Sequence, residues 1–295
     1  MQTDSKLKKL LYKLMLLLPD KWYIMLKFYK NFGRFPNLKN PITFNEKIQW
    51  LKLHDRNPLY TKLVDKYEVK KYVADIIGAE YIIPTLGVWD RAEDIDFDAL
   101  PNQFVLKATH DSGRVIICRD KSTLDRCLAV EEMRQSLKRD FYSVTREWPY
   151  KNVPRRIIAE QLLVDDSGAD DIKDYKFFCF NGEPVYCQVI RDRRSRETID
   201  FYDMDWVHQE FCGLNPVARN GLTPVARPAT LKTMRQICKK LAKVKTFVRI
   251  DLYEVREKVY FGEITFYPMS GMGVFTPNRW NSILGGLIHL PEKDA

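Results

Sequence analysis

Charged side chains alternate with apolar ones in two neighbouring segments near the C-terminal end, residues 247–254 and 259–266. A period of two predicts strands, and the two segments together predict a hairpin. Arg249 and Asp251 share the polar face of the first strand, and Glu263 lies on that of the second. If three residues form the turn, Asp251 stands opposite Glu263, where two carboxylates repel each other.

A divalent cation between Asp251 and Glu263 removes this repulsion. Mg²⁺ takes hard oxygen ligands of this kind and completes its shell with phosphate oxygens. Arg249, on the same face, is then placed to meet a phosphate in transfer. The alternative is an ordinary hairpin whose polar face contacts water. The hairpin alone leaves both interpretations open.

A lysine precedes a glycine-containing loop earlier in the chain. Residues 104–107 and 115–118 are short apolar runs, and the loop between them contains Ser112 and Gly113. Strand, loop and strand predict a hairpin. Backbone N–H groups in such a loop cradle phosphates, and Lys107 at its start supplies a point charge. A solvated lysine at a strand end is the competing interpretation.

Two further polar positions accompany predicted elements. Lys66 follows Asp65 in a predicted helix over residues 61–78, where a surface i,i+4 pattern with Lys70 is an alternative. A predicted strand over residues 157–163 leads into a loop. The alternative interpretation is an ordinary strand end with no functional role. The last four residues of this strand are Glu160, Gln161, Leu162 and Leu163.

The order of these segments resembles the ATP-grasp superfamily. The order is Asp65 and Lys66, then Lys107 with its glycine loop, then Glu160, then Arg249 and Asp251, then Glu263 and Thr265. Four short sequence motifs are similar to those of the TupA-like ATP-grasp group: PITFNEK (residues 41–47), GVW (87–89), LP (100–101) and GEITFYP (262–268). The resemblance runs from about Asn40 to the C-terminal end.

The resemblance implies how ATP is held. Lys66 and Lys107 are similar to the two lysines that bind the ATP phosphates. The loop of residues 108–114, with Ser112 and Gly113, resembles the flexible lid over them. The linker that reads the edge of adenine through its backbone corresponds to Glu160, Gln161, Leu162 and Leu163.

The resemblance also implies the reacting end of the site. Asp174 is similar to the carboxylate that holds the ribose, and Arg249 to the charge that stabilises the phosphoryl group in flight. Asp251 and Glu263 resemble the magnesium ligands, with Thr265 as a third. Many ATP-grasp enzymes have Asn where this chain has Thr265, and a hydroxyl is a weaker ligand. We interpret the threonine as a trait of the subgroup, and it lowers the expectation of two bound metal ions.

These segments predict an α+β chain with the ATP-grasp fold, two subdomains gripping ATP, and a helical N-terminal extension. The expected boundaries are residues 1–55 for the extension, 56–102 for the first subdomain, 103–163 for the lid subdomain and 164–295 for the subdomain with the metal site. The expected helices are residues 6–18, 20–29, 43–51, 61–78, 123–139 and 229–243. A hairpin around Asn181-Gly182 is expected from residues 175–190.

Composition narrows the class of partner. The 295 residues carry a net charge of +9 and 45% hydrophobic residues, as expected of a globular protein with anionic ligands. No dense basic block, zinc-finger spacing or RNP-like motif indicates nucleic-acid binding. The six cysteines form no C-x-x-C pair and no signal peptide is evident, so a cytoplasmic location is expected.

The expected function is an ATP-dependent carboxylate–amine ligase that works through an acyl phosphate. TupA-like proteins are associated with acidic cell-surface polymers, so the expected partners are ATP, an amino acid and a uronic acid or acidic glycan. A basic cluster at Arg191, Arg193, Arg194 and Arg196 could bind the acidic substrate, although a solvated loop fits equally. The Leu/Lys pattern of residues 6–18 also allows a peripheral contact with the inner face of a membrane. Packing on the next helix, whose Trp22, Ile24, Leu26 and Phe28 need burial, is the stronger interpretation.

Two alternatives remain from the sequence. A glycosyltransferase of the same pathway would need a metal motif of the D-x-D type, and Asp203-Met204-Asp205 is formally one. A binding module with a degenerate ATP-grasp fold is the other, and the intact Lys107, Asp251 and Glu263 argue against it.

Overall fold

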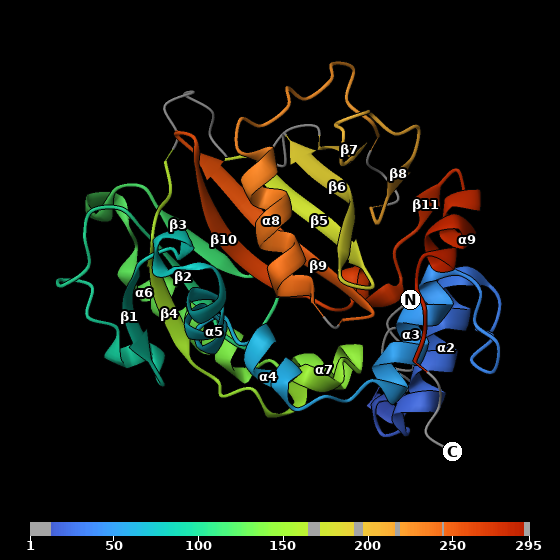
Figure 1. Cartoon of the computed structure of the whole chain (residues 1–295). Coiled ribbons are helices and arrows are strands. Elements are labelled where there is room, and N and C mark those ends of the chain that lie inside the picture. The colour runs from blue at the N-terminus through green and yellow to red at the C-terminus, as the bar shows by residue number, and fades with distance from the viewer. Residues whose placement is uncertain (1–12, 165–171, 192–196, 216–218, 244, 292–295) are drawn as a thin grey trace.

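Two antiparallel sheets dominate the structure, a computed structural model that describes residues 13–164, 172–191, 197–215, 219–243 and 245–291. The smaller sheet has the order β1-β4-β2-β3 and the larger one β10-β9-β5-β6-β7, while β11 and β8 form a short ribbon (Figure 1). The strands are β1 Thr85–Trp89, β2 Phe104–Ala108, β3 Val115–Cys118, β4 Ile157–Gln161, β5 Asp174–Phe180, β6 Glu183–Arg191, β7 Thr198–Asp203, β8 Cys212–Gly213, β9 Phe247–Val255, β10 Lys258–Thr265 and β11 Phe275–Thr276.

Helices cover the outer faces of both sheets. In Figure 1, α8 crosses the larger sheet, and α2 and α3 lie beside α9 at the other end of the molecule from the smaller sheet. The helices are α2 Asp20–Phe32, α3 Phe44–His54, α4 Leu59–Val64, α5 Glu68–Ile77, α6 Arg126–Lys138, α7 Phe141–Thr145, α8 Leu231–Ala242 and α9 Arg279–Gly286. Short 3₁₀ turns include η4 Trp148–Asn152 and η5 Pro268–Gly271. No helix within the described residues is long and apolar enough to cross a membrane.

Each sheet has one apolar face, and the charged side chains of its strands lie on the other face. In the smaller sheet, Phe104, Leu106, Ile157 and Ala159 are buried in one cluster with Met133 of α6. In the larger sheet, alternate apolar residues of β9 are buried with α8 in a second cluster, and β5 is buried along its whole length. The alternate residues of these strands therefore point to the opposite faces.

Most predicted elements are present. Thr43 caps α3 in a full capping box with Glu46, as the sequence indicated. The hairpin of β5 and β6 turns at Asn181 and Gly182, both with positive φ. The helix expected over residues 20–29 continues to Phe32 and ends at Gly33 in the left-handed conformation.

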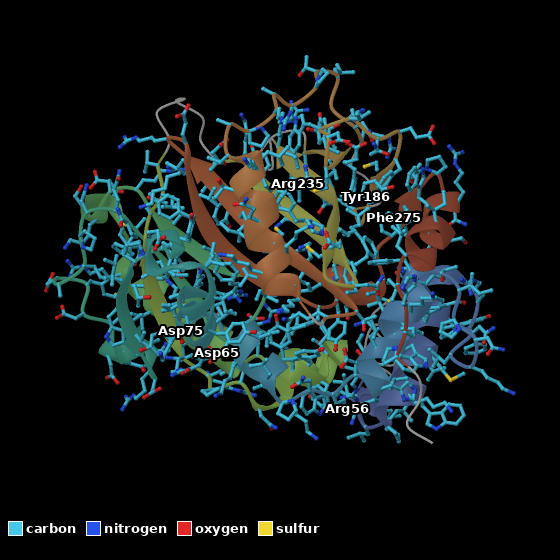
Figure 2. All side chains as sticks on the ribbon, viewed as in Figure 1. Arg56, Asp65, Asp75, Tyr186, Arg235 and Phe275 are labelled. Carbon is cyan, nitrogen blue, oxygen red and sulfur yellow. The ribbon has the colours of Figure 1, made fainter. Side chains whose placement is uncertain are left out.

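Three expectations about these elements were wrong. The helix expected over residues 61–78 is broken into α4 and α5, because the side chain of Asp65 accepts the N–H groups of Tyr67 (2.9 Å) and Glu68 (3.3 Å) and starts a new helix. Asp65, labelled in Figure 2, lies at this break. The strand expected over residues 157–163 ends at Gln161, so Leu162 and Leu163 follow it in the loop. The third wrong expectation was that all four apolar residues named on α2 are buried.

On α2, Ile24 and Phe28 are buried as expected, but Trp22 keeps 55% and Leu26 keeps 42% of its surface exposed. Trp22 and Leu26 are four residues apart, so they share the face of α2 that is exposed. The helix expected over residues 6–18 lies mostly outside the described residues, and residues 13–16 are helical. The four domain boundaries stay a prediction.

Candidate nucleotide and metal site

The hairpin of β9 and β10 reaches the expected pairing by a different route. Its turn has two residues, Arg256 and Glu257, both with positive φ, where three were expected. A turn of two would place Gly262 opposite Asp251. A β-bulge between Phe261 and Glu263 adds the missing residue, so that Glu263 pairs with Asp251 as predicted.

Arg249 holds the two carboxylates together. Its Nε donates to Asp251 Oδ1 at 2.7 Å and its Nη2 to Asp251 Oδ2 at 2.8 Å. The same Nη2 donates to Glu263 Oε1 at 2.7 Å and to Thr265 Oγ1 at 3.1 Å. The predicted repulsion is therefore relieved by an arginine within the chain.

Lys176 of β5 supplies a second cation. It lies in register with Asp251, forms an ion pair with it, and reaches Asp174 Oδ2 at 2.7 Å. Burial raises the pKa of Asp251, even though Arg249 and Lys176 oppose that effect. Burial also acts to raise the pKa of Glu263, but Arg249, Lys176 and Lys66 outweigh it and lower that pKa. Glu263 is thus the more strongly ionised of the two carboxylates.

The donor set fits Mg²⁺ in part. Glu263 keeps 41% of its side-chain surface exposed, and only Oε1 is bound by other described residues. Asp251 has both oxygens bound to Arg249. Within the described residues no group of three or more His, Cys, Asp or Glu side chains is arranged around a cation. Two carboxylates that share the metal with phosphate oxygens remain a usual magnesium arrangement.

On the polar face of the smaller sheet, Glu160 lies between two lysines. Lys107 of β2 contacts Glu160 Oε2 at 2.5 Å, and Lys70 of α5 contacts Oε1 at 2.6 Å. Burial acts to raise the pKa of Glu160, but the two ammonium groups outweigh it and lower that pKa. Lys107 is therefore held at the base of the predicted lid, and Glu160 is a charged group there.

Lys66 contacts the first residues of the lid loop. Its backbone N–H donates to Thr109 O at 3.2 Å, and its ammonium group donates to the carbonyl of Asp111 in the lid loop. Burial lowers its pKa, while the charge of Glu263 raises it. Lys66 is thus close to the charges of both sheets.

The lid loop is anchored at its root and open at its tip. Thr109, His110 and Asp111 are buried, whereas Ser112 and Gly113 are exposed. Arg139 Nη1 pairs with Asp111 Oδ2 at 2.8 Å, and Asp111 Oδ1 accepts the Ser112 N–H at 2.7 Å. The root of the loop is therefore fixed by these contacts, and its tip is exposed.

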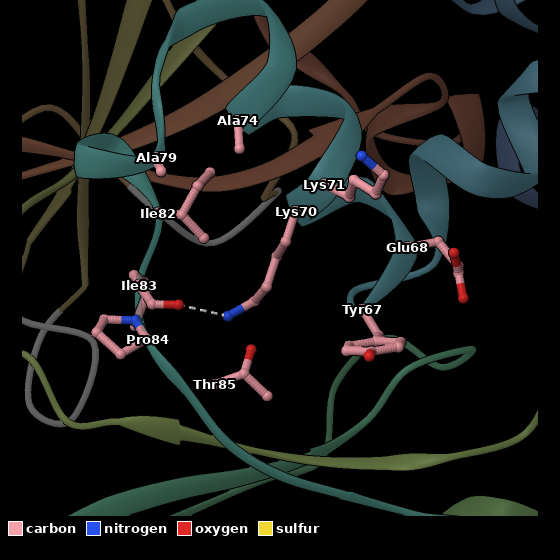
Figure 3. Close-up of a pocket in the computed structure, with 10 residues that line it drawn as sticks. All are labelled: Tyr67, Glu68, Lys70, Lys71, Ala74, Ala79, Ile82, Ile83, Pro84 and Thr85. Carbon is pink, nitrogen blue, oxygen red and sulfur yellow. Dashed lines mark hydrogen bonds between the residues drawn. The ribbon is translucent and has the colours of Figure 1, made fainter.

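An open groove of about 460 Å³ lies between α5 and the segment before β1 (Figure 3). Lys70 crosses it to donate to Ile83 O at 2.6 Å, and Thr85 lies below (Figure 3). Beside it, the Gln161 N–H donates to Pro84 O at 3.0 Å. That N–H is therefore engaged within the protein, and the predicted contact of Glu160, Gln161, Leu162 and Leu163 with adenine stays a prediction.

The D-x-D triplet Asp203-Met204-Asp205, on which the glycosyltransferase alternative depended, lies in a turn that the side chain of Asp203 stabilises. Asp203 Oδ1 accepts the N–H groups of Asp205 and Val207, each at 2.9 Å, directly after β7. Arg191, from the predicted basic cluster, binds Asp200 at 2.8 Å. Arg193, Arg194 and Arg196 lie outside the described residues.

The family is decided by a match over most of the chain. The profile of the family described as TupA-like ATPgrasp matches residues 46–289. The chain belongs to the TupA-like ATP-grasp family. This confirms the family and the α+β ATP-grasp fold expected from the sequence. No curated protein matches the sequence.

Several solved structures are similar to this TupA-like ATP-grasp protein at low identity. The D-alanine–D-alanine ligase of Bacillus anthracis complexed with ATP is 16% identical, with a TM-score of 0.45 over 76% of this chain and 61% of that one. The D-alanine–D-alanine ligase of Helicobacter pylori is 14% identical, with a TM-score of 0.40 over 79% and 60%. The ATP-grasp ligase PsnB complexed with minimal precursor is 10% identical, with a TM-score of 0.39 over 72% and 55%. The chain spans less than two thirds of each.

Two residues of this TupA-like site were missed in the sequence. Lys176 stands two residues after Asp174 on one strand face, and this D-x-K alternation was the available signal. Lys70 was interpreted as part of a surface pattern, but it contacts Glu160. Both lysines bind acidic residues far away in the sequence, so their partners depend on the fold.

Proposed function

We propose that the protein is an ATP-dependent ligase that activates a carboxylate as an acyl phosphate and joins it to an amine. The observation that carries this proposal is that charged side chains of both sheets act on one lysine, Lys66. Arg249, Asp251 and Glu263 lie on the larger sheet, while Lys107 and Glu160 lie on the smaller one. Lys66 lies within electrostatic reach of both. Such an arrangement suits a nucleotide triphosphate held between two sheets.

In the proposed reaction, a carboxylate oxygen of the substrate attacks the γ-phosphorus of ATP. The new O–P bond forms as the bond to the β-phosphate oxygen breaks, and ADP leaves with the electron pair. Lys107 and Lys66 neutralise charge on the phosphates, and Arg249 stabilises the phosphoryl group in transfer. The amine then attacks the acyl carbon and releases phosphate.

Asp251 and Glu263, with Thr265 beside them, would hold magnesium. When bound, it neutralises charge on the phosphate oxygens. Arg249 and Lys176 act to lower the pKa of both carboxylates, but they outweigh the effect of burial only at Glu263. Asp174 is proposed to hold the ribose, although its neighbour in the structure is Lys176.

The proposed substrates are an amino acid and a uronic acid or acidic glycan of a cell-surface polysaccharide. The net charge of +9 supports an anionic partner. A cytoplasmic location with a peripheral contact at the inner membrane face is proposed with it. The exposed Trp22 and Leu26 of α2 support that contact.

An ADP-release assay tests the function. Purified full-length protein is given Mg-ATP, glucuronic or galacturonic acid, and a panel of amino acids. We expect ADP release that requires both organic substrates, and a hydroxamate when hydroxylamine replaces the amino acid. The variant Arg249→Lys keeps the charge but loses the fork-shaped contact, so turnover should fall at least tenfold. Consumption of a sugar nucleotide without ADP release from ATP would contradict the proposal.

A further inference from the structure

Polar side chains on one face of α3 bind the backbone of the loop that follows β10. Asn45, Gln49 and Lys52 stand at positions i, i+4 and i+7 of the helix, and each keeps at most 1% of its surface exposed. All three donate hydrogen bonds to residues 270–273. A buried polar group is costly unless it is hydrogen-bonded, so the contacts with this loop account for the polar face.

The two amides of α3 use all their side-chain N–H groups on this loop. Gln49 Nε2 donates to Ser270 O at 2.9 Å and to Gly271 O at 3.0 Å. Asn45 Nδ2 donates to Gly271 O at 3.0 Å and to Gly273 O at 2.8 Å. In the part of the chain that the structure describes, both amide oxygens are buried without a hydrogen-bonding partner. An apolar residue would avoid that cost, so the N–H groups explain why amides stand here.

Lys52 and Asn31 bind the same loop. Lys52 Nζ donates to Ser270 O at 3.3 Å and to Ser270 Oγ at 3.0 Å, and that hydroxyl donates in turn to Thr145 O at 3.3 Å. Asn31 Nδ2, from α2, donates to Met272 O at 2.8 Å. The carbonyl oxygens of four consecutive residues, 270–273, are therefore all bound by side chains of α2 and α3. Together these four side chains form a clamp on the loop.

The clamped backbone has an unfavourable conformation. Met269 and Ser270 have φ values of 49° and 56°, and Gly271 follows with 67°, so three consecutive residues are left-handed. A side chain carries a steric penalty in this region, which glycine avoids. A Cβ on Gly271 would lie 2.4 Å from Gln49 Nε2, so the backbone also approaches α3 closely. The clamp thus holds Met269 and Ser270 in a strained conformation.

The register of the larger sheet places this loop at the substrate end of the proposed site. Along β9, Arg249 comes first, then Asp251, and then Tyr253, whose partner on β5 is Asp174. Arg249 is level with Thr265, the last residue of β10. The proposed ribose contact, metal ligand and phosphoryl contact therefore follow one another toward the end of β10, and the loop begins just beyond it. Because the attacking and leaving oxygens lie roughly in line, the attacking carboxylate approaches from the side of this loop.

We propose that the clamp residues Asn31, Asn45, Gln49 and Lys52 are positioning residues, which hold the left-handed loop where it aligns the carboxylate substrate with the γ-phosphate. The inference rests on the proposed ligase function. The clamp acts through the loop, whose Met269 side chain is 58% exposed and open to a ligand. The N-terminal helices, expected to be an extension of the fold, thereby become part of the site.

The main experiment removes two of the clamp's hydrogen bonds. Gln49→Met keeps the length of the side chain but loses both donors. We expect kcat/KM for glucuronic acid to fall by about tenfold or more, measured as hydroxamate formed with Mg-ATP and hydroxylamine. The Kd of a non-hydrolysable ATP analogue should stay within about twofold, because the nucleotide is proposed to lie on the other side of Arg249.

A second substitution separates positioning from stability. Glycine has no penalty in the left-handed region, so Met269→Gly in the Gln49→Met background should restore kcat/KM by about threefold or more. Met269→Ala also removes the long side chain but keeps the Cβ, so it should restore none. All rates are measured well below the melting temperature of each variant. A purely structural clamp would then change the melting temperature and leave kcat/KM as in wild type.

Lys47→Met is the matched control. Lys47 also ties α3 to a distant carbonyl, Ile288 O at 2.7 Å, but does not contact the loop. This variant should keep kcat/KM within about twofold of wild type. If Gln49→Met does not fold, Asn31→Ala replaces it, because the exposed Asn31 can be changed without disturbing the core. Its loss of one clamp contact should lower kcat/KM by about threefold.

Three results would overturn the inference: an unchanged kcat/KM in the clamp variant, an equal loss of affinity for the ATP analogue, or equal recovery with glycine and alanine at Met269. Each of them, with an active wild type, removes the clamp and leaves the ligase function standing. If the wild type forms no hydroxamate and releases no ADP with any acid, the proposed function fails and the inference fails with it.

Discussion

At the scale of single residues, the two carboxylates of the hairpin differ in how firmly they are held. Asp251 is 1% exposed and binds Arg249 and Lys176, whereas Glu263 has a partly exposed side chain and one oxygen outside the arginine contact. Breaking a buried ion pair from one side typically costs about 3–5 kcal/mol. The same loss of charge at a half-open position costs far less. The two positions therefore separate stability from activity.

The first prediction concerns Glu263→Gln. We expect turnover to be abolished with little change in thermal stability, because the variant loses a charged ligand but few buried contacts. The comparison is Asp251→Asn, which should lose turnover and also unfold at lower temperature, since Arg249 and Lys176 lose a partner. Glu257→Gln, at the exposed turn of the same hairpin, is the matched control and should change neither. Near wild-type turnover in both site variants would remove the hairpin from the reaction.

The second prediction concerns the lysines on Glu160. Lys107→Met should weaken ATP binding by about 1.5–3 kcal/mol, the scale of a charge-assisted hydrogen bond, which is roughly ten- to a hundredfold in Kd. Isothermal calorimetry with a non-hydrolysable ATP analogue measures it. Lys70→Met is the informative partner, because it removes the other contact to Glu160. Unchanged affinity in Lys107→Met would exclude Lys107 from the phosphate site.

The residues of the β9–β10 hairpin could be predicted from the sequence. The contact of Lys176 with that hairpin could not, because it depends on how the strands pair. The alternation around Arg249 and Asp251, together with the position of Glu263, indicated which side chains share a face. Lys176 could not be assigned in the same way, since its partner Asp251 lies 75 residues further along the chain. That contact exists only because β5 pairs with β9 in one particular register.

At the scale of elements, one bulge decides whether the two carboxylates meet. The turn of the β9–β10 hairpin has two residues, which alone would shift β10 by one position relative to β9. The bulge at Gly262 corrects that shift. A Cβ on Gly262 would lie 2.9 Å from Tyr253 Cε2 and 3.0 Å from the backbone oxygen of Asp251. A side chain can rotate away from such a contact, but the backbone of a central strand can shift little.

The third prediction follows for Gly262→Ala. We expect a loss of about 1–3 kcal/mol in the free energy of unfolding, as for other overpacked sites, together with reduced turnover. Urea unfolding and the ADP-release assay measure the two effects. Gly286→Ala is the control, because no atom lies within 4 Å of the added Cβ at the end of α9. If Gly262→Ala keeps both stability and turnover, the bulge is not needed to align Glu263.

Local signals explain which elements were predictable. The capping box of Thr43 and Glu46 and the Asn181-Gly182 turn are strong short-range patterns, and both appear in the structure. The break at Asp65 had a signal too, since Asp followed three residues later by Glu68 is a common helix start. The turn at Arg256 and Glu257 had none, because neither residue favours the left-handed conformation that the structure gives both.

At the scale of the whole molecule, α2 presents apolar residues outward at one end of the chain. Trp22, Leu26 and Tyr29 are exposed, and their spacing places them on one face of the helix. Lys21 and Lys30 are exposed on the same helix. An aromatic and aliphatic face flanked by lysines is typical of helices that lie on an anionic membrane surface. A lipid-linked glycan substrate would give such a contact a purpose.

The last prediction tests this contact in full-length protein. We expect co-sedimentation with vesicles that contain anionic lipid at low salt, and much less with neutral vesicles. The double variant Trp22→Ser, Leu26→Ser should reduce pelleting, because it removes apolar area without touching the buried side of α2, which Ile24 and Phe28 occupy. A variant that starts at Asp20 removes residues 1–19 and shows whether they add to binding. Each lysine near the surface contributes about 1 kcal/mol, which salt screens, so binding should weaken as salt rises. Equal pelleting of wild type and double variant, or none by either on anionic vesicles, would leave α2 with no membrane role.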